Sequence, residues 1–314
     1  MRLSTLFRRS VHGPTPGVTA WTAFLRAKIQ NILQACAHAK KGRLYPHPMA
    51  FVERDFEPRF RPAAPSPAKP YVSIVIPTWN GGDELRDTLE HLREFRTGLD
   101  YTTEIVIVDD CSEQSTVRIV EEFAANNERT VVFTNDRNRG KGHAVTRGML
   151  NATGAFRIFV DSDLAYPSGE ITKMLRRLEA GSDVVIACRV LPESRYVMSP
   201  TFIHYLYTRH VMSRLFNRLA QLVLLPGILD TQAGLKGFTA RAAETIFSRQ
   251  TLCGFGFDLE SLFIARSHHL KIEQVPVDFH YNDEPSTVSF AKHGVEMLMD
   301  LIRVRRNGAR GIYA

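Results

Sequence analysis

The chain has 314 residues, of which 44% are hydrophobic and 23% charged, so it can build a sizeable core as one large α/β domain with an extension or as two modest domains. Its net charge of +7 is concentrated in residues 1–70, which carry 12 lysines and arginines but only 3 acidic residues. A basic extension of this kind suggests an anionic partner, such as a membrane surface or a nucleic acid.

Cysteine spacing and hydropathy exclude several other classes of protein. The four cysteines fit no zinc or CxxC motif and imply no disulfide framework, which makes a reducing cytosol the simplest setting. The apolar run at 219–229 is well below the roughly 20 residues that a membrane span needs. The uncharged run at 10–25 contains prolines and glycines and makes a poor signal-peptide core. We therefore expect a cytoplasmic protein.

Residues 1–70 are predicted to be an extension ahead of the main domain. Residues 18–41 have apolar side chains at helical spacing and no acid, which is typical of a basic amphipathic helix. Such a helix can lie on an anionic membrane, pack on the domain, or belong to a poorly ordered tail or a transit peptide. Residues 59–70 are rich in proline and alanine, as a stiff linker would be. We expect one globular domain at 71–314.

From Tyr71 onward, short apolar strands alternate with helical segments. Strands are predicted at 72–76, 104–108, 130–133, 156–160 and 183–187, and helices at 83–95, 116–125, 141–151 and after Pro167. This alternation predicts an α/β fold with a mainly parallel sheet and helices on both faces. Ligands of such sheets bind beyond the carboxyl ends of the strands. Polar residues follow several of these ends, namely Asn80, Asp109, Asp110, Asp161 and Asp163.

Asp161-Ser162-Asp163 follows the buried-looking strand at 156–160. Two carboxylates one residue apart can jointly orient Mg²⁺ or Mn²⁺, which prefer oxygen ligands and keep waters and phosphates in their shells. Such a metal would neutralise a diphosphate leaving group. In isolation the motif is more often a solvated turn, but its place at a strand end favours a metal site with Asp161 and Asp163 as ligands.

Asp109-Asp110 ends the strand at 104–108. A carboxylate here could accept hydrogen bonds from a ribose hydroxyl or a base N–H. The alternative is a turn or helix cap ahead of Ser112. Both roles are plausible, one for each aspartate.

Asn138-Arg139-Gly140-Lys141-Gly142 lies between a strand and a helix. Glycines permit close backbone approach, and a lysine such as Lys141 can meet phosphate charge. The P-loop pattern is absent, and no GxGxxG follows the first strand, where Pro77-Thr78-Trp79-Asn80 stands instead. A dinucleotide-binding Rossmann protein is therefore disfavoured.

Two later segments are candidates for an acceptor site. Residues 201–225 contain no acid, and Arg209 and Ser213 share a helix face at spacing i, i+4. The segment is either a membrane-facing helix that receives an anionic lipid head or a core-packed helix with a solvated basic face, which composition alone favours. Asp258 lies at the start of an apolar helix. It is either a carboxylate of the acceptor site or simply a residue that the helix dipole favours there.

These motifs, taken in order, resemble the family-two glycosyltransferases of GT-A fold, and within them the dolichyl-phosphate β-glucosyltransferases and bacterial polyprenyl-phosphate relatives. The resemblance covers about residues 71–306. Its motifs are Ser73-Ile74-Val75-Ile76-Pro77-Thr78-Trp79-Asn80, Val108-Asp109-Asp110-Cys111-Ser112, the 138–142 loop, Asp161-Ser162-Asp163, Asp230-Thr231-Gln232-Ala233-Gly234-Leu235-Lys236, Phe257-Asp258-Leu259-Glu260 and Glu273-Gln274-Val275-Pro276-Val277.

The resemblance implies residue roles. Pro77, Trp79 and Asp109 would hold the nucleotide, with Trp79 in place of the usual Tyr, and Lys236 would approach the donor phosphates. Acceptor phosphate would be met by residues that match those of polyprenyl-phosphate mannosyltransferases, namely Arg189, Arg209 and Ser213.

The chain departs from the patterns of these relatives at two single residues and in one three-residue segment. Gly81 stands where an acidic residue usually follows the asparagine, and Ala165 replaces a mannosyltransferase glutamine, as in the glucosyl branch. Pro285-Ser286-Thr287 replaces the branch's Gly-Ser-Lys.

The implied reaction is inverting, metal-dependent transfer of a hexose, expected to be glucose, from a UDP-sugar to a polyprenyl phosphate on the cytoplasmic face of a membrane. A phosphate monoester with a second pKa of about 6 is already an anion at neutral pH and scarcely needs a general base such as Asp258. The alternatives are a soluble hydroxyl acceptor, which would need a base, a GDP-mannose donor, and a non-catalytic nucleotide-sugar-binding module. We expect no nucleic-acid partner, because no recognised module supports one.

Overall fold

The computed structural model describes residues 69–163, 165–197, 203–280 and 290–314, with only the backbone of 203–212 and 290–293. The helix predicted at 18–41 and the Pro285-Ser286-Thr287 segment therefore lie outside the described residues. The cysteines at 111, 188 and 253 are free.

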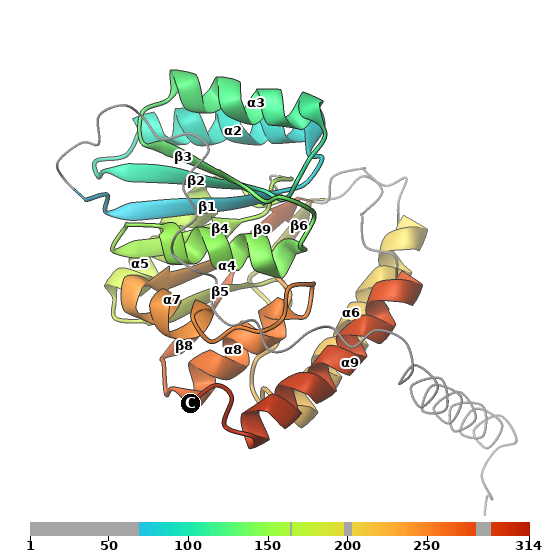
Figure 1. Ribbon diagram of the computed structural model, residues 1–314. Coiled ribbons are helices and arrows are strands. Elements are labelled where there is room, and N and C mark those ends of the chain that lie inside the picture. Colours follow the sequence, from blue (N-terminus) through green and yellow to red (C-terminus); the bar gives the residue numbers. More distant parts are fainter. Residues whose placement is uncertain (1–68, 164, 198–202, 281–289) are drawn as a thin grey trace, which may run out of the picture. The chain divides into compact units, whose positions relative to one another are not determined.

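A seven-stranded sheet forms the centre of this part of the chain (Figure 1). Its order is β3 (Thr130–Thr134), β2 (Thr103–Asp109), β1 (Val72–Thr78), β4 (Phe156–Val160), β7 (Leu235–Thr239), β5 (Val184–Cys188) and β8 (Ile272–Pro276). Six of these strands run in one direction, whereas β7 is antiparallel to both of its neighbours. A separate pair joins β6 (Arg195–Val197) to β9 (Asp278–His280).

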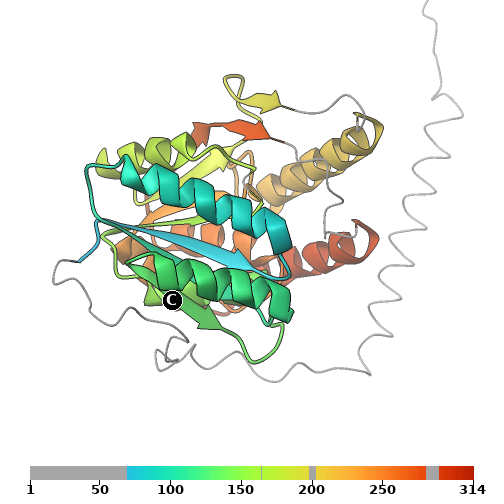
Figure 2. The same cartoon turned by 90° about the horizontal axis from the view of Figure 1, so that it is seen from above.

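Helices cover both faces of the sheet, and alternate strand residues serve the two cores. In β1, Val75 packs in the same core as Val145, whereas Ile74 and Ile76 pack with Leu89 in the other. The first core is covered by α4 (Lys141–Asn151), α7 (Ala240–Phe247) and α8 (Phe257–Ser267), and the second by α2 (Gly82–Thr97), α3 (Gln114–Asn126) and α5 (Gly169–Glu179). Figures 1 and 2 show α2 and α3 side by side. The predicted α/β fold is confirmed.

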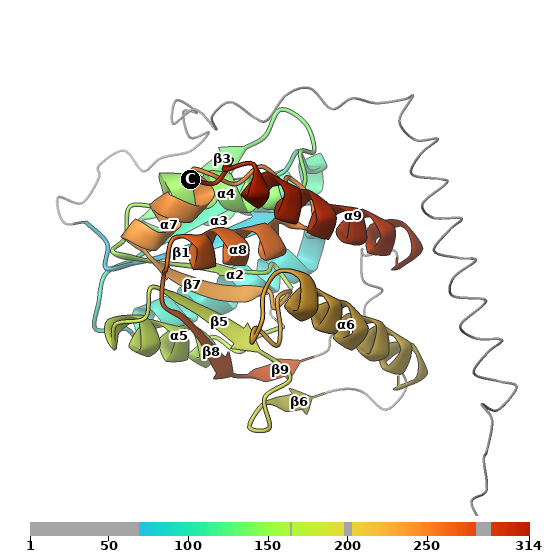
Figure 3. The same cartoon turned by 90° about the horizontal axis from the view of Figure 1, so that it is seen from below.

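Two longer helices, α6 (Ile203–Val223) and α9 (Phe290–Ala309), lie alongside one another (Figures 1 and 3). Both contribute to the first core, through Ala220 of α6 and Leu301 of α9. Each also leaves apolar residues in solvent: Leu215, Leu222, Val295, Leu298, Met299 and Ile302. Among the described residues, none of the helices is both long and apolar enough to cross a membrane.

A buried carboxylate fixes the loop that precedes α8. Glu260 is inaccessible to solvent and accepts the backbone N–H groups of Thr251 and Leu252 at 2.8 and 2.7 Å, as well as the Thr251 hydroxyl. The Tyr313 hydroxyl also donates to it, at 2.7 Å. Since a buried carboxylate needs such donors, this network holds residues 251–257 in place beside the first turn of α8.

Candidate active site

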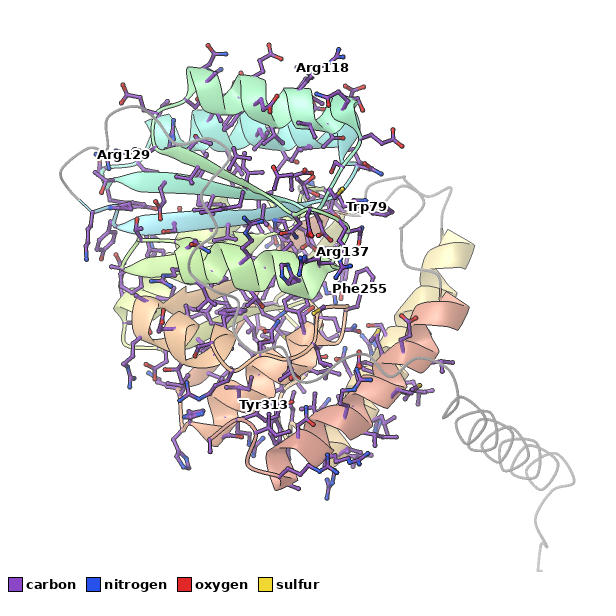
Figure 4. All side chains as sticks on the ribbon, in the orientation of Figure 1. Trp79, Arg118, Arg129, Arg137, Phe255 and Tyr313 are labelled. Carbon is purple, nitrogen blue, oxygen red and sulfur yellow. The ribbon has the colours of Figure 1, made fainter. Side chains whose placement is uncertain are left out.

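The expected polar residues meet at the edge of the sheet where the parallel strands end. Figure 4 shows Trp79, Arg137 and Phe255 at this edge. Trp79 follows β1 and is 50% exposed, whereas Pro77 is buried within the strand. Asn80, whose φ is 53°, accepts a hydrogen bond from the Glu113 N–H at 2.7 Å. The loop after β1 is thereby tied to the loop after β2, and the indole ring remains open to a ligand.

Asp161 and Asp163 follow β4, and Lys141 lies beside them. The Lys141 Nζ is 2.6 Å from Asp161 Oδ1, and the Asp161 N–H donates to the Gly234 carbonyl at 3.0 Å. Asp163 accepts from the Ala165 N–H at 3.1 Å. Desolvation and the neighbouring Asp161 carboxylate raise the pKa of Asp163. The two carboxylates therefore favour a cation at this position.

Gly234 is the residue that allows Asp161 to sit where it does. A Cβ on Gly234 would lie 2.0 Å from Asp161 Oδ2, far inside van der Waals contact. The close fit forms a small cradle for the carboxylate, which is a suitable support for a metal ligand. Among the described residues, no group of three or more metal-ligating side chains exists. Two carboxylates suit Mg²⁺ or Mn²⁺, which take waters and phosphates as the remaining ligands.

Lys141 is the first residue of α4, and its surroundings keep it charged. Burial disfavours the ammonium, but the carboxylates of Asp161, Asp258 and Asp163 outweigh this effect and raise the pKa of Lys141. A Cβ on the preceding Gly140 would lie 2.6 Å from the Cys253 carbonyl oxygen. The glycine therefore lets the start of α4 rest directly on the loop at 251–257.

The two aspartates after β2 have different structural partners. Asp109 is buried and accepts from the Ser112 N–H at 3.2 Å, which is the turn that we considered as the alternative to ligand binding. Asp110 accepts from the backbone N–H groups of Arg139 and Gly140 at 2.9 and 2.7 Å. Asp110 thus shapes the loop at 138–142. Direct nucleotide contacts by either aspartate stay a prediction.

A polar network beneath this loop was not foreseen from the sequence. The Asn135 side-chain amide donates to Asp110 at 2.6 Å and lies 3.3 Å from His143 Nδ1, while its oxygen accepts from Arg147 at 2.7 Å. These contacts use both amide N–H groups, so His143 Nδ1 is the acceptor of a neutral ring. Burial first, and then the positive charge of Arg139, lower the pKa of His143 to about 4.

Lys236 and Asp258 form a buried ion pair. Lys236 is inaccessible to solvent, donates to Asp258 Oδ1 at 2.5 Å and to the Ala233 carbonyl at 2.7 Å, and lies over the Phe159 ring. Asp258 is in the first turn of α8, as expected, and its carboxylate turns towards Lys236. The structure brings these two predicted site residues together and joins β7 to α8. Contact between Lys236 and donor phosphates stays a prediction.

Arg189, which follows β5, forms a two-bond ion pair with buried Asp230. Its Nε and Nη2 donate to the two carboxylate oxygens at 2.7 and 3.0 Å, and its guanidinium lies 5.4 Å from the centre of the Phe279 ring. Burial alone would raise the pKa of Asp230, but the interaction with Arg189 lowers it. Asp230 begins a motif that the sequence identified, yet its pairing with Arg189 was not foreseen.

Helix α6 is anchored beside the turn that contains Asp230 and Thr231. Its Asn217 is 3% exposed and accepts from the Thr231 N–H at 3.1 Å and the Thr231 hydroxyl at 2.8 Å. Ser213 lies one turn earlier and is half-buried, whereas the side chain of Arg209 is outside the described residues. Of the two interpretations of this segment, a core-packed helix describes the face that carries Asn217. The opposite face carries exposed Leu215 and Leu222. The helix therefore has one packed and one exposed face.

Comparisons with known proteins agree with this arrangement. The family model "Glycosyl transferase family 2" matches residues 73–247. Dolichyl-phosphate beta-glucosyltransferases from Dictyostelium discoideum and Saccharomyces cerevisiae are each 29% identical, with 77% of this chain and 76% of the relative covered. Glucosyl-3-phosphoglycerate synthase from Mycobacterium tuberculosis has a TM-score of 0.53 at 16% identity, with 75% and 80% covered. Mannosyltransferase PcManGT from Pyrobaculum calidifontis, solved with GDP-Man and Mn²⁺, has 0.52 at 19%, with 91% and 73% covered.

The contact between Gly234 and Asp161 gives a first prediction. We expect Gly234→Ala to push the Asp161 carboxylate aside and weaken Mn²⁺ binding at least about tenfold, because misplaced ligands and their supports typically cost 10–100-fold. Electron paramagnetic resonance of free Mn²⁺ measures the change. Gly254→Ala is the control, since a Cβ there meets nothing within 4 Å. Equal Mn²⁺ affinity in the two variants would contradict the prediction.

The His143 network predicts a loss of stability in mild acid. Its folded-state pKa of about 4 lies below the ordinary 6.5, so the unfolded chain takes up a proton that the folded chain resists. As pH falls from 6.5 to 4, the free energy of unfolding should decrease by about 2–3 kcal/mol on this account. Urea unfolding across this range should show a smaller decrease for His143→Gln than for wild type. The exposed His91 provides the control, and His91→Gln should keep the wild-type slope.

Proposed function

Since this chain belongs to glycosyl transferase family 2 and has the GT-A fold, we propose that it transfers a hexose, expected to be glucose, from a UDP-sugar to a polyprenyl phosphate with inversion of configuration. The observation that carries the proposal is the set of Asp161, Asp163 and Lys141 at the carboxyl edge of the sheet, next to a turn that holds Arg189 and α6. The set would form a site for a metal ion and a diphosphate, and the neighbouring turn with Arg189 would form a basic region for a second anion.

The donor would lie along the carboxyl edge of the sheet. Trp79 offers an exposed aromatic face to the base, and we assign Asp109 to the nucleotide as well, although its carboxylate is buried at the end of β2 and accepts from the Ser112 N–H. Asp161 and Asp163 would hold Mg²⁺ or Mn²⁺, which when bound supplies positive charge to the departing diphosphate. Lys141, whose Nζ lies 2.6 Å from Asp161 Oδ1, would add a hydrogen-bonding ammonium. These residues orient the donor and stabilise the charge that develops on the leaving group.

The acceptor phosphate would lie between the turn after β5 and helix α6. Arg189 is part-buried, and Asp230 orients its planar guanidinium. We assign Arg209 and Ser213 to the same phosphate because they share a face of α6. A phosphate anion is already a nucleophile at neutral pH, so what it needs is orientation and surrounding positive charge.

Asp258 is proposed to position residues rather than to act as a required base. Its carboxylate is 2.5 Å from Lys236 and is almost fully buried. Acting as a base would require it to give up this partner, which is unfavourable for a buried ammonium. The proposed acceptor makes no such demand, because it carries no proton that must be removed.

A peripheral position on the cytoplasmic face of a membrane fits the exposed side of α6 and α9. Leu222 and Ile302 are 79% and 63% exposed. Arg218 and Arg303 lie near them in the sequence and are also largely exposed. Apolar side chains with neighbouring arginines favour an anionic lipid surface. Such a position would bring a lipid-linked acceptor to the Ser213 end of the site.

Donor and acceptor assays test the proposal directly. Full-length protein with Mn²⁺ is heated with UDP-glucose, UDP-galactose or GDP-mannose, and we expect UDP-glucose to raise the melting temperature most. Labelled glucose should then pass from UDP-glucose to a polyprenyl phosphate and not to 3-phosphoglycerate. Transfer to 3-phosphoglycerate alone would favour the soluble-acceptor alternative, and selective stabilisation by GDP-mannose would favour a mannosyl donor. Donor binding without transfer to any acceptor would indicate a binding module.

The Lys236–Asp258 pair predicts different results for single and double variants. Asp258→Asn leaves a buried ammonium without its counter-charge, so its melting temperature should fall, whereas Lys236→Gln/Asp258→Asn replaces the pair with neutral groups and should recover stability. If Asp258 mainly positions Lys236, the double variant should keep transfer to polyprenyl phosphate within about 100-fold of wild type, because a required general base contributes 10²–10⁴-fold. If Asp258→Asn, shown to be folded at the assay temperature, loses several decades of transfer whereas Lys236→Gln does not, Asp258 would instead be a required base.

The α6–α9 surface predicts how vesicle binding responds to substitution. Leu222→Glu combined with Ile302→Glu should weaken binding to phosphatidylserine vesicles at least about tenfold, since burying each apolar side chain contributes about 1.5–3 kcal/mol. Cosedimentation measures the bound fraction. Val197→Glu changes an apolar residue that is 55% exposed on β6 and should leave binding unchanged. Wild-type binding by the double variant would exclude this surface.

A further inference from the structure

Asp161 is enclosed between a lysine and a glycine. Its Oδ1 is 2.6 Å from the Lys141 Nζ, and its Oδ2 faces Gly234 so closely that a Cβ there would lie 2.0 Å away. Only about a quarter of the side-chain surface of Asp161 and of Lys141 is exposed. Any further cation that reaches this carboxylate therefore meets the positive charge of Lys141 at short range.

The charges around Asp161 are balanced differently with and without ligands. Lys236 pairs with Asp258, at 2.5 Å, whereas Lys141 pairs with Asp161, at 2.6 Å, and its ammonium also faces the charge of Asp163. Lys141 and the carboxylates of Asp161 and Asp163 together carry one positive and two negative formal charges. A divalent cation alone would turn this into an excess of positive charge. A diphosphate that arrives with the cation would restore the balance.

Lys141 can change its hydrogen-bonding partner by a movement of its side chain alone. Its backbone is fixed, because Gly140 and Gly142 rest against the 251–257 loop and Asp110 holds the N–H of Gly140 at 2.7 Å. The side chain has four flexible carbons and ends in a single charged group with three rotatable donors. The ammonium can therefore turn from a carboxylate to a neighbouring phosphate while α4 stays in place.

We infer that in the free protein the Lys141 ammonium takes the place of the metal ion beside Asp161. It moves to the donor diphosphate when the metal ion binds. This inference deepens the proposed function and rests on it, since it concerns the same metal and diphosphate site. Its consequence is cooperative binding: the diphosphate draws Lys141 away from the carboxylates and makes room for the metal, and the metal strengthens diphosphate binding by the same factor. A coupling of about 10-fold or more is expected, within the usual range of 5–150-fold.

The test measures Mn²⁺ affinity with and without UDP in the full chain. Wild type should bind Mn²⁺ weakly alone and about tenfold more tightly with saturating UDP, by calorimetry and by electron paramagnetic resonance. Lys141→Met and Lys141→Gln, each shown by thermal melting to be folded, should bind Mn²⁺ alone about tenfold more tightly than wild type and gain less from UDP. Arg137→Gln removes a positive charge from an exposed residue at the same edge and should leave both affinities within about twofold (Figure 4).

The outcomes separate this inference from the proposed function. Mn²⁺ binding by the Lys141 variants that is no tighter than in wild type, with UDP and Mn²⁺ still bound, would overturn the inference and leave the proposed function standing. Equal tightening in Arg137→Gln would also overturn it, since general electrostatics would then be the cause. No Mn²⁺ binding by wild type, even with UDP, would overturn both.

Discussion

The reversed direction of β7 is the constraint on which the site depends. Because β7 runs against β4, its first residue pairs with the last residue of β4, Leu235 with Val160. The turn at 230–234 therefore reaches the edge at which the parallel strands end, and its Gly234 carbonyl accepts the Asp161 N–H. A parallel strand at this position would carry the turn to the opposite edge, away from Asp161. Asp230, Gly234 and Lys236 are neighbours of the acidic motif for this one topological reason.

The cations of the site are paired with carboxylates within the chain. Lys141 pairs with Asp161, Lys236 with Asp258 and Arg189 with Asp230. A buried cation without a partner is strongly unfavourable, so these pairs let the fold keep positive charge at this edge of the sheet. They differ in accessibility, since Lys236 is fully buried whereas Lys141 and Arg189 are partly exposed. The partly exposed pairs are the ones that a ligand can reach.

The sequence predicted the bounds of the helices and strands better than it predicted strand direction and the contacts between distant residues. Helix α4 and strand β4 begin and end at the expected residues, because a glycine-rich start and an uninterrupted apolar run mark them clearly. The direction of β7 could not be predicted, since LKGFT is short and its inward lysine breaks the apolar pattern. The Arg189–Asp230 pair joins residues 41 positions apart and depends on that direction. His143 gave no signal, because its role follows only from contacts with Asn135 beneath the loop.

Three glycines that touch the site lie at positions that leave no room for a side chain, whereas other positions of the site are open to solvent. At 140, 142 and 234 the space that even a methyl group would need is filled by a neighbouring backbone, by Phe257 or by Asp161. At the same edge of the sheet, Trp79 and Arg137 are exposed to solvent (Figure 4). Among descendants of such a chain, the open positions can accept new side chains, whereas the closed ones are expected to remain glycine.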